Sequence, residues 1–485
     1  MKFYSNILFL LLTLPAFGAT YYVRPAGGTY GAEDGSSWAN AFDGFSDVAW
    51  GGGANQVGAG DTLYVGAGTY TQKLTPGASG TAGNPITIRA AQETQIGVAT
   101  FSGSGSAVDG SGISYVIING EYNGGRNFNF AENINYQNMN FCEAWYFTMT
   151  NACMLLQFSA SNRVAYGVID CGSNEDFCIN GEGSDNIDAY DQTFIHNNIL
   201  IMPGQQSDGD GADGLKIGAG FTVFSNFIGN YTGTYYKDDE PDAEHQDLIA
   251  HYGNNYTRIF ANEFGNTGDA GIGYDGAGSS EISHVKIYNN VFRFTTVNMG
   301  AVMVRFYSAS GPVTDCIDIQ IDNNTFIDAS RTTLDYGSAI RLHTGGGTTT
   351  ATDCSIRNNI IYNCGDNWNA ILIQGFTDNW NFSNNRINAG AHGNALTSSW
   401  VQDNGQTGAP SFVSYTEYAT SGNDFRLTAA DDNGATLTGF SVDKNNINRP
   451  QRTVWGLGAF EYPASESSGP VANVGTMNAG NTYLR

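Results

Sequence analysis

The pattern of apolar and polar positions repeats along the middle of the chain. Alternating apolar residues lead into Asn or Asn-Asn, and one further residue and an apolar residue follow. The second Asn position of the seven copies is occupied by Asn198, Asn226, Asn262, Asn290, Asn324, Asn359 and Asn385. The intervals between them are 28, 36, 28, 34, 35 and 26 residues. Self-similarity at this period predicts a stack of similar coils.

Asparagine has a structural reason to occupy this position. It tolerates the left-handed backbone conformation that a sharp turn between strands requires. Stacked in successive coils, its amides can also hydrogen-bond to one another in a ladder. We therefore interpret the Asn residues as turn residues rather than sugar ligands.

A second set of short apolar runs lies between the Asn motifs. The runs cover residues 213–217, 247–251, 270–274, 301–305, 339–343 and 370–374. They are poor in charge, as buried parallel strands are, and helical periodicity is absent. The sequence predicts an all-β protein, a single right-handed parallel β-helix over residues 19–463.

The first coils contain motifs with a family likeness. Residues 21–23 read Tyr-Tyr-Val, residues 60–65 read Gly-Asp-Thr-Leu-Tyr-Val, and residues 80–90 begin Gly-Thr-Ala-Gly-Asn-Pro. This part of the sequence resembles secreted β-helix polysaccharide lyases of the pectate, alginate and chondroitin lyase type. The stretch 449–462 resembles the end of such solenoids. The resemblance implies the fold and the assembly of the first coil.

The sequence departs from these families in its catalytic signature. The Asn-Glu-Glu calcium set of the alginate and chondroitin lyases is not found. The clustered Asp plus Lys of the pectate lyases is matched loosely, by Asp208, Asp210, Asp213 and Lys216.

Both ends of the chain differ from the repeat region. Residues 1–18 combine Lys2, a short apolar stretch and small residues, which is typical of a cleaved signal peptide and predicts secretion. Residues 464–485 are rich in Gly, Ser and Asn and are expected to form a flexible tail. No segment has the roughly 20 apolar residues of a membrane-spanning helix, so no membrane association is expected.

The composition of the chain limits the classes of binding partner that we expect. The chain has 46 acidic and 21 basic residues and a formal net charge of −25, which argues against nucleic-acid binding. We expect a monomer whose partner is a polysaccharide substrate. The seven cysteines are interpreted as structural, with Cys171–Cys178 and Cys354–Cys364 as the expected local pairs.

Alternate residues of a strand share a face, which predicts one outward stripe across the six runs. Leu248, Ala250, Val302, Val304, Ile340, Leu342, Ile371 and Ile373 are predicted to point inward. The outward residues then include Asp247, His251, Arg305, Arg341, His343 and Gln374. Lys216 points outward if Leu215 and Ile217 point inward, and the predicted stripe then contains Lys216, His251, Arg305, His343 and Gln374. Tyr274 joins it only if Gly271 and Gly273 face the core.

We predict catalytic roles for Lys216, His251, Tyr274 and Arg305 in this stripe. Arg341, His343 and Gln374 are predicted to bind substrate. A lyase acting on a uronic acid must neutralise the sugar carboxylate, remove the adjacent proton and protonate the leaving oxygen. Arg or calcium suits the first task, and Lys, His or Tyr suits the other two.

Two acidic stretches add candidates. Asp208, Asp210 and Asp213, with Asp247, are candidate calcium ligands, although the spacing departs from the helix–loop–helix calcium pattern. Residues 235–245 include Tyr235, Tyr236 and His245, which could contact sugar rings beside the stripe or belong to an acidic solvated loop.

Three function hypotheses remain at this point. The preferred one is a lyase that cleaves an acidic, uronic-acid-containing glycan by β-elimination, with calcium as the candidate cofactor. The second is a glycoside hydrolase that uses paired carboxylates such as Asp213 and Asp247, with Asp269 or Asp275 nearby. The third is a non-catalytic glycan-binding or adhesive solenoid.

Overall fold

The structure is a computed structural model of the 485-residue chain. The residues that it describes are 18–157, 161–172, 177–181, 192–202, 213–229, 247–252, 255–266, 270–275, 281–294, 302–307, 315–329, 338–343, 349–365, 369–376, 380–388, 394–396, 402–417, 419, 421–429, 431, 433–438, 440–450 and 455–462.

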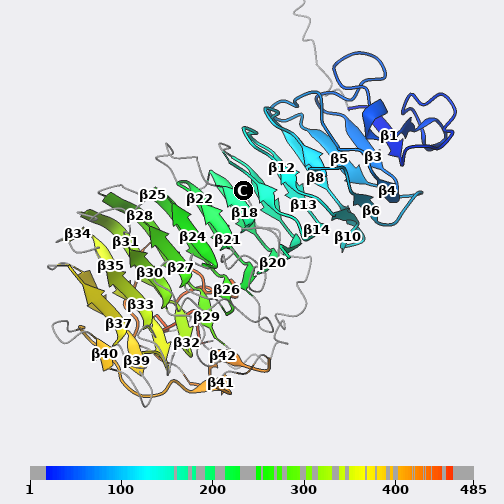
Figure 1. Cartoon of the computed structure of the whole chain (residues 1–485). Helices are drawn as coiled ribbons and strands as arrows, with labels where there is room; N and C mark the ends of the chain where they lie inside the picture. The colour runs from blue at the N-terminus through cyan, green and yellow to red at the C-terminus, as the bar shows by residue number, and fades with distance from the viewer. Residues whose placement is uncertain are drawn as a thin grey trace, which may run out of the picture.

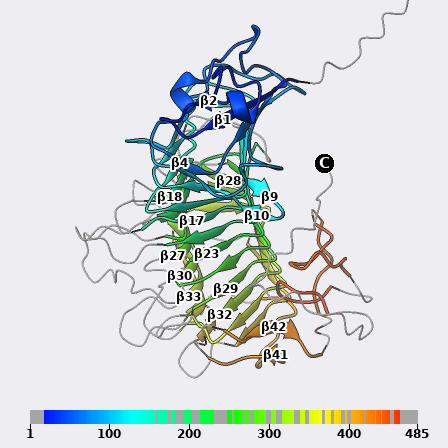
Figure 2. The ribbon, with the colours of Figure 1, turned by 90° about the vertical axis from the view of Figure 1, so that its right-hand side faces the viewer.

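Three long parallel sheets run along a single solenoid (Figures 1 and 2). They contain 15, 12 and 11 strands, and we call them sheets I, II and III. From the coil of β19 onward the chain passes in turn through sheet I, sheet II and sheet III, and then pairs with the coil before it. The predicted all-β parallel β-helix is confirmed.

The strand bounds follow the three sheets. Sheet I contains β2 (Phe42–Asp43), β1 (Thr20–Arg24), β3 (Thr62–Val65), β5 (Ile86–Ala90), β8 (Val116–Asn119), β13 (Glu143–Trp145), β16 (Arg163–Ala165), β19 (Thr193–His196), β22 (Phe221–Phe224), β25 (Asn255–Phe260), β28 (Glu281–Tyr288), β31 (Asp315–Asp322), β34 (Thr350–Thr352), β35 (Cys354–Arg357) and β38 (Trp380–Ser383). Sheet II contains β4 (Gly68–Tyr70), β6 (Ala99–Phe101), β11 (Phe128–Phe130), β14 (Phe147–Thr150), β17 (Val168–Asp170), β20 (Ile199–Ile201), β23 (Phe227–Gly229), β26 (Glu263–Phe264), β29 (Val291–Arg293), β32 (Thr325–Ile327), β36 (Ile360–Tyr362) and β39 (Arg386–Asn388). Sheet III contains β7 (Val108–Asp109), β12 (Ile134–Asn135), β15 (Met154–Leu155), β18 (Phe177–Gly181), β21 (Asp213–Ile217), β24 (Ile249–Tyr252), β27 (Ala270–Asp275), β30 (Val302–Tyr307), β33 (Ser338–His343), β37 (Asn369–Gln374) and β40 (Asn394–Leu396).

Several short elements lie outside the three long sheets. Two 3₁₀ turns, η1 (Trp38–Asn40) and η2 (Phe45–Asp47), lie in the first coil. Two small antiparallel pairs are formed by β9 (Glu121–Tyr122) with β10 (Gly125–Arg126), and by β41 (Phe412–Ser414) with β42 (Asp424–Leu427). Among the residues described, no helix is long and apolar enough to cross a membrane.

The turn between sheets I and II uses two consecutive residues for two different tasks. The first residue is left-handed in every repeat: Asn197, Ser225, Ala261, Asn289, Asn323, Asn358 and Asn384 have φ between 54° and 57°. The second residue is the repeated Asn, which is buried. The expected left-handed turn and the expected ladder are both present, but they belong to different residues. The first residue has the left-handed conformation, and the repeated Asn that follows it forms the ladder.

The repeated Asn residues form a continuous ladder. Oδ1 of Asn290 accepts hydrogen bonds from the backbone N–H of Asn262 at 2.9 Å and from Asn262 Nδ2 at 3.1 Å. Nδ2 of Asn290 donates to the carbonyl of Ile259 at 2.8 Å. The same pattern joins Asn198 to Asn226 and continues to Asn385. Each amide therefore satisfies buried polar groups of the coil before it.

Aromatic residues also stack from coil to coil. Inside sheet II, Phe264, Phe292 and Phe326 follow one another at centroid distances of 4.4 and 4.8 Å. Outside sheet I, His196, Phe224, Phe260 and Tyr288 form a second stack at 4.6, 5.0 and 4.9 Å. Since the stacking distance matches the strand spacing, identical register in each coil brings rings of the same column face to face.

The C-terminal part returns over the turn and over sheet II. Asn289 Nδ2 donates to the carbonyl of Val442 at 2.7 Å, and Asn323 Nδ2 donates to Gly456 at 2.9 Å. Phe425 and Ala459 pack on Val291 and Ile327 of sheet II. The returning segment thus covers part of the outer face of this sheet. This segment seals apolar strand surface that would otherwise face water.

A buried ion pair fixes the returning segment. Arg449 Nη1 lies 2.9 Å from Glu461 Oε2, and both side chains are almost fully buried. The guanidinium also donates to Asn289 Oδ1 at 3.2 Å and to the carbonyl of Gly458 at 2.8 Å. The pair thus ties the segment to the Asn turn of β28 and β29.

The cysteine predictions have mixed outcomes. Cys171 and Cys178 form a disulfide, as expected. The expected Cys354–Cys364 pair is wrong: both thiols are free and buried. Cys354 lies at the start of β35 in sheet I, whereas Cys364 follows β36 in sheet II, so the two belong to different faces of one coil.

The Asn ladder predicts a stability defect. Asn290→Ala removes the acceptor of two donors of Asn262 and the donor to Ile259, which leaves buried polar groups without partners. We expect the free energy of unfolding to fall by about 3 kcal/mol. Urea denaturation measures the change, with Asn84→Ala at an exposed turn as control, expected within about 0.5 kcal/mol of the parent. Equal midpoints for the two variants would contradict the ladder's role.

The outer aromatic stack predicts a pH effect. Burial is the main reason why the pKa of His196 is lowered to about 4. The nearby charge of Arg163 also lowers this pKa, whereas the hydrogen bond to Asn197 raises it. Because the folded pKa lies below the unfolded value of about 6.5, the contribution to stability is complete above pH 6.5 and is lost as pH falls toward 4. We expect His196→Phe to flatten the fall in Tm over this window. An unchanged slope in the variant would show that other groups control it.

Candidate functional site

The register of sheet III decides which predicted site residues share a face. Pairing places His251 opposite Ile217, Tyr274 opposite His251, and Phe306 opposite Tyr274. Leu342 and Ile373 continue the column. The column consists of buried residues and faces the core.

The outward orientation predicted for His251 is therefore wrong. Its side chain is fully buried, stacks on Tyr274 at a centroid distance of 4.0 Å, and places Nε2 2.6 Å from Thr257 Oγ1 of sheet I. The inward pair in this strand is Ile249 and His251, so the predicted inward pair Leu248 and Ala250 is shifted by one residue. The strand contains three adjacent apolar residues, and such a run does not specify its own register.

Tyr274 also belongs to the core. It is 1% exposed, and burial raises its pKa well above 10, with the nearby Cys316 thiol adding to the shift. Gly273, not Tyr274, takes the outward position of this strand. A buried phenol in this column cannot contact a glycan lying on the outer surface.

By backbone register, the strand positions of sheet III that alternate with the inward column form a row that we call the cationic row. In order of coils it consists of Asn180, Lys216, Ala250, Gly273, Arg305, Arg341 and Leu372. Lys216 and Arg305 were predicted to share a stripe, and the backbone register places them in one row, together with Arg341. The side chains of Lys216 and Arg341 are partly exposed, whereas Asn180, Ala250, Gly273 and Leu372 are buried.

His343 and Gln374 lie in a different row. They pair with each other two residues beyond Arg341, in line with the backbone positions of Tyr252, Asp275 and Tyr307 on the earlier strands. The predicted single stripe is thus two outward rows, separated by the inward column of His251 and Tyr274. The sequence analysis missed Asn180 and Tyr307. Asn180 pairs with Lys216 on the next strand, and Tyr307 lies two residues beyond Arg305 in the same strand.

Two small residues make a gap in the cationic row. Ala250 and Gly273 separate Lys216 from Arg305 by two intervening strands. The Asp247 carboxylate lies over Gly273, where a Cβ would collide with Asp247 Oδ2. The row therefore presents a carboxylate between a lysine position and an arginine position.

The backbone holds this carboxylate in place. Asp247 Oδ1 accepts a hydrogen bond from the N–H of Ala270 at 3.0 Å. The N–H of Asp247 in turn donates to Asp213 Oδ1 at 3.0 Å. Asp213 and Asp247 thus lie on adjacent coils at the start of β21 and just before β24, and both are mostly buried.

Several predicted residues lie outside the described part of the chain. These are Asp208, Asp210, Tyr235, Tyr236, His245 and Asp269. Within the part that is described, no group of three or more His, Cys, Asp or Glu side chains is placed to hold a metal ion. Asp213 and Asp247 alone do not make a calcium site, so calcium stays a proposal that depends on Asp208 and Asp210.

Comparison with known proteins gives matches in structure only. No family model matches the sequence, and no curated protein matches it. Pectate lyase Pel9A is 15% identical, with 92% of this chain and 97% of that chain covered and a TM-score of 0.36. The alginate lyase AlyGC of family PL6 is 12% identical at a TM-score of 0.41; 93% of this chain is covered, and this chain spans 58% of the length of that enzyme. XylC in complex with xylose is 9% identical, with 91% and 98% coverage and a TM-score of 0.44.

The parallel β-helix is shown by the three sheets of the structure itself. At these identities the activity has to be inferred from the residues of this chain.

The contact between Asp247 and Gly273 predicts a coupled stability effect. Gly273→Ala inserts a methyl group into the space of the carboxylate and should lower the free energy of unfolding by about 1–3 kcal/mol. In an Asp247→Ala background the same change should cost little, because the obstacle is gone. Urea unfolding of the four proteins measures the coupling. Gly52→Ala, in open space, is the matched control, and additive effects at positions 247 and 273 would contradict the contact.

Proposed function

We propose that this protein is a secreted polysaccharide lyase that cleaves an acidic, uronic-acid-containing glycan by β-elimination on the outer face of sheet III. The observation that carries the proposal is the cationic row with its gap at Ala250 and Gly273. A chain with a net charge of −25 repels polyanions at long range. A row that aligns one lysine with two arginines, which lie beyond two intervening strands of the solenoid, is a local exception suited to an anionic chain.

The roles follow from the demands of the reaction. Arg305 and Arg341 would neutralise the sugar carboxylate, which acidifies the neighbouring C–H bond. Lys216, on the other side of the gap, would remove that proton as the general base. The electron pair then forms the new double bond as the glycosidic oxygen leaves, and this oxygen needs a proton.

The proton donor is assigned to the second outward row. His251 and Tyr274 are excluded by their position in the core. Tyr307 lies two residues beyond Arg305, and His343 lies two residues beyond Arg341, which is the register of the next outward row. These residue types can supply a proton to a leaving oxygen near the cationic row. Gln374 continues this row as a substrate-binding candidate.

A glycoside hydrolase on the same face is the second candidate. Its support is the direct backbone-to-carboxylate contact of Asp213 and Asp247, which brings two carboxyl-bearing residues to adjacent coils. Hydrolysis needs two carboxyl groups about 5–9.5 Å apart, one as acid and one as base or nucleophile. Both carboxylates already accept a backbone N–H, however, which fits a positioning role equally well.

A product assay separates these functions. The protein is incubated with alginate, polygalacturonate, chondroitin, hyaluronan and neutral polysaccharides, with and without a chelator. We expect ultraviolet absorbance from a new carbon–carbon double bond on one of the acidic substrates, and a loss of about 100-fold or more in Lys216→Ala at unchanged Tm. Asn84→Ala, remote from sheet III, is the control.

The other outcomes of this assay are informative. New reducing ends without absorbance, abolished by Asp247→Asn, would establish the hydrolase instead. Binding without any product would leave a glycan-binding solenoid. A loss of activity with the chelator, restored by calcium, would support the proposed metal site.

A further inference from the structure

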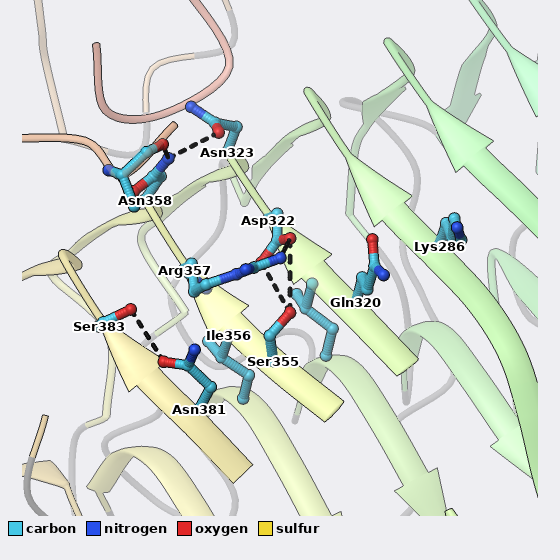
Figure 3. Close-up of polar contacts among 12 residues, drawn as sticks. Lys286, Gln320, Asp322, Asn323, Ser355, Ile356, Arg357, Asn358, Asn381 and Ser383 are labelled. Carbon is cyan, nitrogen blue, oxygen red and sulfur yellow. Dashed lines mark hydrogen bonds and ion pairs between the residues drawn. The ribbon is translucent and has the colours of Figure 1, made fainter. Parts of the chain in front are cut away.

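The outer face of sheet I carries a polar row that the proposed reaction does not use. Lys286 pairs with Gln320, Gln320 with Ser355, and Ser355 with Asn381, so the four residues lie on successive strands (Figure 3). Beside this row lies a cavity of about 570 Å³ that is widely open to solvent. Its lining includes Gln320, Asp353, Ser355, Arg357, Asn381 and Thr438.

One wall of the cavity is a guanidinium held in place by a carboxylate. Arg357 Nη2 lies 2.6 Å from Asp322 Oδ2, and Nε lies 3.3 Å from Oδ1. Ser355 Oγ also donates to Asp322, at 3.3 Å (Figure 3). Because Asp322 draws Arg357 aside and Ser355 is small, the space between Gln320 and Asn381 stays open.

The opposite wall is an amide with a fixed orientation. Gln320 Nε2 donates to Asp318 Oδ1 at 2.7 Å, so the amide oxygen of Gln320 points away from Asp318. Asp318 is held in turn by His284 Nδ1 at 3.0 Å and by Lys286 Nζ at 3.8 Å. Asp353, the equivalent corner residue of the next coil, has the same left-handed conformation, with φ of 56° against 52° for Asp318.

The C-terminal segment closes the remaining side through Thr438. Three residues earlier, the backbone of Ala435 makes two hydrogen bonds of 2.8 Å with the side chain of Asn358. The cavity therefore lies between the strands of sheet I and a segment that Asn358 anchors.

The lining selects the chemistry of a ligand. It offers amide, hydroxyl and carboxylate groups, while the charge of Arg357 is compensated by Asp322, so Asp353 leaves the lining negative. An anionic ligand is disfavoured there. Sugar hydroxyls can donate to Asp353 and to the Gln320 oxygen, and can accept from the amide of Asn381. The volume lies within the roughly 300–1,000 Å³ of small-ligand sites.

We propose that this cavity is a second carbohydrate site, which binds pyranose units of a neutral glycan on a face distinct from sheet III. It holds sugar through hydroxyl contacts and does not depend on the lyase reaction. Its position beside a row of stacked coils allows a longer chain to continue along the solenoid axis over Gln320 and Lys286.

Isothermal titration of the full-length protein with cellopentaose, xylopentaose and mannopentaose tests the site. We expect one of these neutral oligosaccharides to bind, and Asn381→Ala and Asp353→Asn each to weaken Kd about tenfold. Asp353→Asn is isosteric and retains a residue that tolerates the left-handed conformation, so it should keep its Tm. Asn84→Ala and Lys216→Ala should bind as the parent does.

Failure of this site can be told from failure of the lyase proposal. No binding of any of the three oligosaccharides at millimolar concentration would overturn the site, whatever the product assay shows. Binding that both cavity variants retain would place the sugar elsewhere. Binding lost in Lys216→Ala but kept in Asp353→Asn would assign it to sheet III.

Discussion

At the turn between sheets I and II, the amide of one coil completes the hydrogen bonds of the coil before it. Asn290 accepts from Asn262 and donates to Ile259, and Asn324 does the same for Asn290 and Ile287. Such an amide is satisfied only when both coils have the same register, since a slip by one residue would leave several buried polar groups without partners. The ladder therefore fixes the angular position at which each coil restarts.

Rows of side chains on the outer faces are a consequence of this constraint. Once each coil restarts at the same point, residues at equivalent positions lie one strand spacing apart along the whole solenoid. The stack of Phe224, Phe260 and Tyr288, with interplanar angles of 2°, shows how closely the coils repeat. Intervals between the Asn residues vary from 26 to 36, and the extra residues are accommodated away from this turn.

The sequence predicted the stacked coils and the Asn ladder, because each has a local and repeated signal. It did not predict that the residue before each ladder Asn carries the left-handed turn. It did not predict the register of sheet III. Leu248, just before β24, and Ile249 and Ala250 within it are all apolar. Alternation therefore could not show which residue pairs with Leu215, and His251 was assigned to the wrong face. Burial of His251 is stabilised by Thr257 of another sheet, a contact that no local pattern contains. The Cys354–Cys364 pair failed for the same reason: nearness in sequence did not show that the residues lie on different sheets.

The two candidate sites illustrate two ways in which a solenoid can make a binding surface. On sheet III, small residues at Ala250 and Gly273 interrupt an outward row and admit the Asp247 carboxylate between cationic positions. On sheet I, a left-handed corner residue recurs in consecutive coils as His284, Asp318 and Asp353, and each kink turns a polar side chain outward beside the row of Gln320 and Ser355. On sheet I, Asp322 compensates the charge of Arg357, which leaves the cavity lining neutral to acidic. Because a single register governs both faces, a glycan chain aligned with the axis would meet equivalent positions at the same spacing on either side.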